Sequence, residues 1–492
     1  MASTTPNTPP KNLQSRNSYV PSIYTLNTND SQASLALVRQ ANNPSTDSSK
    51  STLQSLIRDG NVDGLFPRAH FVQNISRFIR FASASYGSHF MHVMGINKIP
   101  RPDSRPDSPI AHHYEHHSFS HHTQLPASTI LLSSHVDPQG GTNSSGLTNT
   151  GIPMVHYVSL DHKSQAVILT CRGTLGFEDV LTDLTCDYDD LKYQGNTYKV
   201  HKGIHASARR ILEGAGGRVM ATIKAALEEF PDYGLVMCGH SLGGGVTAVL
   251  AIMISEPGEG TAFVTAGTYS QPQFLLTSSS DANARAPSTA MQLPAGRPIH
   301  VYAYGPPSSI SPSLRQATRG LITTIVNNQD LVPYLSLGVL HDLQAVALAF
   351  KTDESGAKGE VRKRVWAGLT EGLKDRWYTG ENPSSMHGEG EDDAWAYASL
   401  KALKASMQSM KLVPPGEVFV VETQRVLKRD AFVKSEEAQG LGRPATRVIL
   451  KYIRDVEARF GEVRFGGNML LDHSPGRYEL SIGALGHGVL ND

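Results

Sequence analysis

The pentapeptide Gly239-His240-Ser241-Leu242-Gly243 constrains the fold of this 492-residue chain more than any other segment. The apolar run Leu235–Cys238 before it has the length of a buried strand, and the apolar run Leu242–Ile254 after it has the length of a helix. A serine at so sharp a strand-to-helix turn adopts a strained backbone, and the flanking glycines avoid a clash. The helix N-terminus then favours a developing negative charge. This setting predicts a nucleophilic Ser241 rather than a solvated serine in a Gly-rich turn.

Residues 155–325 alternate between strand and helix patterns. Val155–Leu160 and Ala166–Cys171 flank a polar turn and predict a hairpin. One helix is predicted over Ile204–Phe230, and two buried strands over Val301–Tyr304 and Leu321–Val326. Strands that alternate with helices imply an α/β fold, in which a mostly parallel central sheet is covered by helices on both faces.

The domain organisation follows from shifts in composition. Residues 1–60 begin with a long stretch of Ser, Thr, Asn and Pro and are expected to be disordered. Residues 61–492 are expected to form one domain, with polar surface insertions at about 277–297 and 352–393. Within that domain, the apolar spacing across Phe66–Ile96 predicts an amphipathic helix.

Composition excludes several classes of function. Lys plus Arg and Asp plus Glu both number 45, so no net charge attracts nucleic acid. The three cysteines, Cys171, Cys186 and Cys238, make no disulfide framework and favour a reducing compartment. The sequence shows neither a secretory signal nor a transmembrane segment. We therefore expect an intracellular protein that is cytoplasmic or peripherally membrane-associated.

Four further parts of the sequence resemble the class 3 lipase family, and within it the sn-1-specific diacylglycerol lipases. They are Cys171–Thr174 with Asp179–Leu184, Val200–Gly203, Tyr304–Pro306 with Asp330–Pro333, and Met469–Pro475. The resemblance extends over about Phe66–Tyr478. It implies that residues 61–492 form a class 3 lipase-like domain of the α/β-hydrolase fold.

The resemblance also implies a catalytic triad. Ser241 would attack an ester carbonyl, His473 would accept its proton, and Asp330 would orient the imidazole. The chain order Ser, Asp, His is that of α/β-hydrolases. An Asp at position 330 can instead cap a turn, and His341, His387 and His487 also lie downstream of Ser241. His473 is preferred because it follows an apolar run and matches the family motif.

Further residues are assigned to support the triad. The oxyanion would be stabilised by the backbone amides of Leu242 and Thr174. The hydroxyl of Thr174 is a candidate for a third donor. By resemblance, the carboxylate of Asp183 would orient that hydroxyl. Gly239, His240 and Gly243 would support the turn.

The implied function is serine-dependent hydrolysis of lipid esters at a membrane or droplet surface, converting diacylglycerol to monoacylglycerol and fatty acid. Phospholipase A1, a galactolipid, sterol or aryl esterase, and a non-catalytic lipid-binding protein are the alternatives. The mechanism needs no cofactor or metal, and the sequence neither supports nor rules out calcium for membrane contact.

Two segments have open interpretations. Leu331–Phe350 is apolar and fits a lid, a membrane-docking helix or a core helix, while Leu175–Asp183 is the alternative lid by resemblance. The histidines between His112 and His122 fit either a metal-binding module or a polar stretch, and the polar stretch is favoured because few acids and no cysteine accompany them.

Overall fold

The computed structural model describes residues 68–96, 114–134, 154–174, 187–213, 217–258, 262–267, 292–352, 409–425, 446–464 and 466–490. Residues 1–60, which are predicted to be disordered, lie outside this description. So do most of the predicted insertion at 277–297 and nearly all of the one at 352–393.

Eight strands of the described ranges form one twisted sheet in the order β1-β2-β3-β6-β9-β10-β11-β12. Their bounds are β1 Ile130–Ser133, β2 His156–Asp161, β3 Ala166–Cys171, β6 Gly234–His240, β9 Ile299–Tyr304, β10 Ile322–Asn327, β11 Glu417–Arg425 and β12 Thr446–Tyr452. The central run from β3 to β11 is parallel, whereas β1, β2 and β12 pair antiparallel with their neighbours. The predicted α/β fold with a mostly parallel sheet is therefore confirmed.

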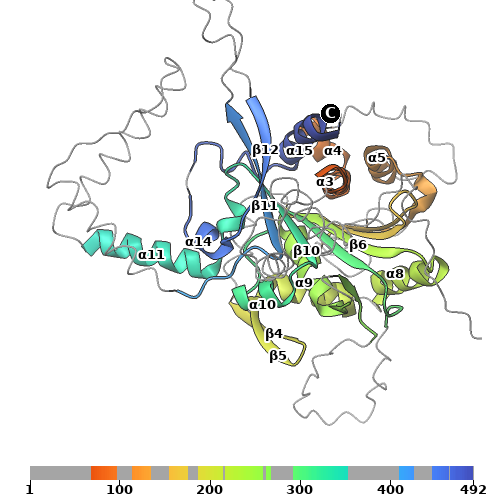
Figure 1. Cartoon of the computed structure of the whole chain (residues 1–492), viewed down its shortest axis with the longest axis horizontal. Coiled ribbons are helices and arrows are strands. Elements are labelled where there is room, and N and C mark those ends of the chain that lie inside the picture. Colours follow the sequence, from red (N-terminus) through yellow and green to blue (C-terminus); the bar gives the residue numbers. More distant parts are fainter. Residues whose placement is uncertain are drawn as a thin grey trace, which may run out of the picture.

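Helices cover both faces of this sheet (Figure 1). On one face α3 (Arg68–Ala84) packs on the central strands beside α15 (Pro475–Leu490). On the other face lie α8 (Arg218–Glu229) and α9 (Leu242–Ile254), with α7 (Lys202–Glu213) against α9. The remaining described elements are α4 Ser88–Val93, α5 Tyr114–Thr123, α10 Pro312–Ala317, α11 Leu337–Thr352, α14 Val456–Phe460, the 3-10 helices η2 Ala127–Thr129 and η4 Val332–Tyr334, and the hairpins β4 Tyr188–Tyr193 with β5 Asn196–His201 and β7 Ser255–Pro257 with β8 Phe263–Thr265.

Strand β6 shows why the central strands are continuously apolar. Its alternate side chains enter opposite cores, because successive residues of a strand point to opposite faces. Leu235 and Met237 pack in the core that includes α8 and α9, and Val236 and Cys238 pack in the core beneath α3 and α15. A strand buried on both faces needs an apolar residue at every position.

Two helix predictions were too long. In place of the helix predicted over 204–230, the described residues form α7 and α8, and Gly217 immediately before α8 has a φ of 71°, outside the helical region. The helix predicted over 66–96 is likewise replaced by α3 and α4, and Gly87 between them has a φ of 87°. The predicted hairpin of β2 and β3 and the predicted helix Leu242–Ile254 are both confirmed.

Candidate active site

The turn between β6 and α9 holds Ser241 in a strained conformation. Its φ of 57° and ψ of −130° lie where non-glycine residues are rare, at a cost on the order of 1–3 kcal/mol. The glycines on either side are required by close packing. A Cβ on Gly239 would lie 2.4 Å from the carbonyl carbon of Gly243, and a Cβ on Gly243 would lie 2.2 Å from the oxygen of Cys171. The predicted reason for both glycines is thus visible in the structure.

Three predicted site residues meet at the carboxyl ends of the central strands. Ser241 Oγ lies 2.9 Å from His473 Nε2. The opposite ring nitrogen, His473 Nδ1, lies 3.0 and 2.9 Å from the two carboxylate oxygens of Asp330. Ser241 follows β6, Asp330 follows β10, and His473 lies two residues before the start of α15. The imidazole therefore bridges the serine hydroxyl and a fully buried carboxylate.

The carboxylate of Asp330 has two donors besides the histidine. The amide of Val332 donates to Oδ1 at 2.9 Å, which explains how a turn-capping role and a role at the site are combined in one residue. The hydroxyl of Tyr478, on α15, donates to Oδ2. Burial, and then the negative charge of Asp330, raise the pKa of Tyr478 well above its usual value, so this hydroxyl remains a donor. Sequence reasoning missed Tyr478, although it lies only five residues after His473.

The loop before His473 is tied to the loop that carries Asp330. The side-chain amide of Asn327 donates to the carbonyl of Asp472 at 3.0 Å. The backbone amide of Gln329 donates to the carboxylate of Asp472 at 3.2 Å. Burial, with the charge of Asp330 adding to it, raises the pKa of Asp472. These bonds flank Asp330 and His473 on both segments and fix the backbone positions of the two residues.

His240 lies beneath the imidazole of His473, with ring centroids 4.6 Å apart. Its Nδ1 lies 2.7 Å from the hydroxyl of Tyr86, a residue that sequence reasoning also missed. Burial, together with the nearby His473, lowers the pKa of His240 well below its usual value. His240 therefore stays neutral and does not add a second positive charge beside His473.

The segment after β3 lies against the serine. A Cβ built on Gly173 would be 2.8 Å from Cβ of Ser241, so Gly173 brings Thr174 to the same end of the sheet. Thr174 Oγ1 is shielded from solvent and has no hydrogen-bond partner among the described residues. The amide of Leu242 is at the N-terminus of α9, where helix amides lack an acceptor within the helix. Asp183, predicted to orient Thr174, lies outside the described residues.

Comparison with known proteins matches residues 168–339 to the family described as lipase (class 3). Residues 168–339 are thus similar to class 3 lipases. This stretch runs from β3 into α11 and contains Ser241 and Asp330, while His473 lies beyond its end. The resemblance that the motifs suggested is confirmed.

Similar proteins include diacylglycerol lipases. Diacylglycerol lipase-beta of Mus musculus is 26% identical over 340 residues, which are 65% of this chain and 42% of the mouse protein. Diacylglycerol lipase-alpha of Homo sapiens is 29% identical over 196 residues, which are 37% of this chain and 15% of the human protein. The chain thus spans less than half the length of these relatives. Among solved structures, the native Rhizomucor miehei lipase propeptide complex aligns with a TM-score of 0.32 and 16% identity, covering 54% of this chain and 64% of that one.

Helix α11 begins at the end of the segment 168–339. One of its ends is buried, as expected of a core helix, and the other is exposed, as expected of a lid or a membrane-docking helix. Val339 is fully buried, whereas Leu348 near the other end is 61% exposed. Figure 1 shows α11 extending away from the sheet. Among the described residues, no helix is both long and apolar enough to cross a membrane. Of the alternative lid at 175–183, nothing is described.

The histidine-rich segment forms α5, which packs on α3 outside the segment 168–339. His116 Nε2 bonds to the carbonyl of Ala127 at 3.2 Å, and His122 Nε2 lies 2.6 Å from the carboxylate of Glu479. In the part of the chain that is described, no three His, Cys, Asp or Glu side chains gather as metal ligands would. The histidines of α5 whose contacts are described thus serve helix packing; His112 and His113 fall outside the described residues.

Proposed function

We propose that this chain is a serine-dependent lipid ester hydrolase that cleaves diacylglycerol to monoacylglycerol and fatty acid. One observation carries the proposal: His473 joins Ser241 Oγ to the buried carboxylate of Asp330 through hydrogen bonds of 2.9–3.0 Å. This arrangement has the geometry of nucleophile, base and orienting carboxylate.

In the proposed first step, His473 Nε2 accepts the hydroxyl proton of Ser241 while Oγ attacks the ester carbonyl carbon. The tetrahedral oxyanion is stabilised by the amides of Leu242 and Thr174, and the positive N-terminus of α9 adds to that stabilisation. His473 then returns the proton to the departing alcohol, which leaves an acyl group on Ser241. Water activated by His473 attacks this acyl-enzyme, releases the fatty acid and restores the serine.

Asp330 would fix the tautomer of His473. Its oxygens accept the Nδ1 hydrogen, which leaves Nε2 free to accept a proton from Ser241. Bonds from Val332 and Tyr478 hold the carboxylate in place, and its negative charge stabilises the imidazolium that forms. The unpartnered hydroxyl of Thr174 is available as an additional donor to the oxyanion.

A lipid substrate is supported by the family and by apolar residues close to the site. Leu470 and Leu471 precede His473 by only three and two positions, and they are 50% and 59% exposed. Large aliphatic side chains at the edge of a reaction centre are suited to contact with a lipid surface. The choice of diacylglycerol rests on the names of the relatives. We further propose that the protein meets this substrate as a peripheral membrane protein.

The proposal is tested by hydrolysis of a long-chain diacylglycerol, a phospholipid and a short-chain aryl ester, with the wild-type chain and Ser241→Ala. We expect release from diacylglycerol that disappears in the variant. Preferential release from the phospholipid would keep the mechanism and replace the substrate. Activity on none of the three, without labelling of Ser241 by a fluorophosphonate, would overturn the hydrolase proposal and favour a lipid-binding protein.

A further inference from the structure

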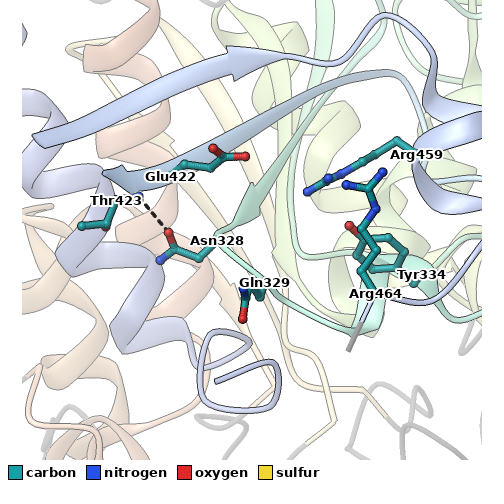
Figure 2. Close-up of a pocket in the computed structure, with 7 residues that line it drawn as sticks. All are labelled: Asn328, Gln329, Tyr334, Glu422, Thr423, Arg459 and Arg464. Carbon is teal, nitrogen blue, oxygen red and sulfur yellow. Dashed lines mark hydrogen bonds between the residues drawn. The ribbon is translucent and has the colours of Figure 1, made fainter. Parts of the chain in front are cut away.

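A polar cavity of about 300 Å³ lies beside the loop that carries Asp330 (Figure 2). None of Ser241, His473 and Asp330 lines it. Asn328 and Gln329 reach it from the end of β10, and Tyr334 reaches it from η4, so both sides of Asp330 along the chain contribute to its wall. The remaining lining comes from β11 and from α14 and the residues after it.

Two arginines give this cavity its charge. The guanidinium carbon of Arg459, near the end of α14, lies 6.0 Å from the ring centre of Tyr334. Its Nε is shielded from solvent and has no hydrogen-bond partner among the described residues. Arg464 lines the same cavity and is otherwise exposed. Within the part of the chain that the structure describes, neither guanidinium forms an ion pair. Two neighbouring guanidinium groups without a counter-charge repel each other, and an anion relieves that repulsion.

The carboxylate in the cavity does not neutralise these arginines. Glu422, on β11, is already paired with the ammonium of Lys451 on β12. Burial raises the pKa of Tyr334, and the charges of Arg459 and Arg464 oppose that rise without cancelling it. The Tyr334 hydroxyl is thus a neutral donor. The cavity therefore combines two cationic groups with a neutral hydroxyl and the side-chain amides of Asn328 and Gln329.

We propose that this cavity is a binding site for a dianionic phosphate group. Guanidinium groups present paired N–H donors that match the oxygens of a phosphate, and two of them match its charge. Two hydrogen bonds orient the side chain of Asn328: its oxygen accepts from the backbone amide of Thr423 at 2.9 Å (Figure 2), and its NH₂ group donates to Oδ1 of Asn327 at 3.3 Å. The NH₂ group keeps one further hydrogen that a ligand oxygen can accept. The ligand is either free inorganic phosphate or the headgroup of an anionic lipid such as phosphatidic acid.

The position of the cavity gives the ligand a route to the triad loop. Gln329 is the residue before Asp330. Its backbone amide donates to the carboxylate of Asp472, which is the residue before His473. A phosphate that contacts Gln329 and Tyr334 would hold the loop on either side of Asp330. The site is thus placed to stabilise the position of Asp330 without contacting the substrate ester.

The test measures binding rather than turnover, so it does not depend on the proposed hydrolysis. Isothermal titration of the full chain with inorganic phosphate, at constant ionic strength, is the first arm. Flotation of the full chain carrying Ser241→Ala with phosphatidylcholine vesicles, with or without phosphatidic acid, is the second. Each arm compares Arg464→Gln and Arg459→Gln with Arg210→Gln, which removes the same charge from an exposed position on α7.

We expect Arg464→Gln to weaken binding about tenfold or more, because a hydrogen bond to a charged group is lost, and Arg210→Gln to leave it unchanged. Arg464 is exposed, so its loss should not impair folding, and Arg459→Lys replaces Arg459→Gln if the latter is unstable. Arginine-dependent binding in the first arm alone identifies free phosphate as the ligand. Arginine-dependent flotation that requires phosphatidic acid identifies a lipid headgroup. Absence of binding in both arms, or an equal loss in Arg210→Gln, would overturn the proposal.

Discussion

The hydroxyl of Tyr478 and the imidazole of His473 bind the same carboxylate, that of Asp330. Tyr478 lies in the first turns of α15, the helix that begins two residues after His473. One short segment thus supplies both the proposed base, His473, and a second donor to the carboxylate that binds it. The orientation of the imidazole consequently depends on how α15 packs as well as on the loop after β10.

Replacing Tyr478 with Phe should therefore reduce turnover while leaving substrate affinity largely intact. The change removes one donor from a buried carboxylate, which costs about 1–3 kcal/mol of stability. If about 1.4 kcal/mol of that loss affects the transition state, kcat falls about tenfold with little change in KM. Steady-state kinetics on the preferred ester measures both quantities.

Tyr452→Phe is the matched control for that variant. Tyr452 also donates its hydroxyl to a carboxylate, that of Glu417, but on β11 and β12. The Tyr452→Phe variant should lose a similar amount of folding stability as Tyr478→Phe, while its kcat stays unchanged. An equal fall in kcat in both variants would mean that Tyr478 acts only through general stability.

Asp330→Asn should lower kcat by about three to four orders of magnitude, because an amide NH₂ favours the wrong tautomer of His473. Nε2 would then carry the hydrogen and could not accept the proton of Ser241. Asp342→Asn serves as the control, since Asp342 is equally buried but pairs with Lys411 at 2.6 Å. The rate of fluorophosphonate labelling reports this loss independently of substrate choice. Equal labelling of the Asp330→Asn and wild-type chains would contradict the assigned orientation.

The turn around Ser241 and the parallel sheet were predictable because their signals are local. β6 is buried on both faces, so its residues before the turn form an unbroken apolar run. Gly239 is required by contacts with Gly243 and Gly244, within a few residues, whereas the contact that requires Gly243 is with the distant Cys171 and was visible in the sequence only through the motif. The motif that contains His473 was likewise recognised as one short segment of sequence.

Tyr86 and Tyr478 were not predictable because their roles arise from tertiary packing. Tyr86 is 154 positions from His240, and Tyr478 is 148 positions from Asp330. A single tyrosine in a helical pattern is typical of an ordinary core residue, and nothing nearby in sequence marks its partner. The break between α7 and α8 was missed for a different reason, since apolar spacing continues through Gly217 while the backbone does not.

Alanine at two glycines should have opposite effects on stability. On Gly243, a Cβ would lie 2.2 Å from the oxygen of Cys171 and 2.7 Å from its carbonyl carbon, so backbone must move. Gly243→Ala should cost about 1–3 kcal/mol and displace Ser241. On Gly483, in α15, a Cβ meets nothing within 4 Å. Gly483→Ala should add about 0.5–1 kcal/mol, because alanine loses less backbone entropy in a helix. Urea unfolding of both variants measures these changes; a stabilised Gly243→Ala would contradict the packing at the turn.

Buried histidines should make the protein less stable in acid. Burial lowers the pKa of His300 to about 3, although a bond to the backbone of Gly320 partly opposes the shift, and burial also lowers the pKa of His240. An unfolded histidine has a pKa of about 6.5. Between pH 6.5 and about 3 the unfolded chain therefore binds more protons than the folded chain, and stability falls as pH falls.

The loss should approach about 1.4 kcal/mol per pH unit for each such histidine. His300→Gln retains a side chain able to bond Thr323, which lies 3.0 Å from His300 Nε2, but it does not titrate. The free energy of unfolding should thus fall less steeply between pH 6.5 and 4.5 in His300→Gln than in the wild type. Comparing slopes cancels any constant loss from the substitution and the titration of carboxylates that both chains share. Parallel slopes would show that His300 takes up its proton in the folded protein, and so is not held neutral by burial.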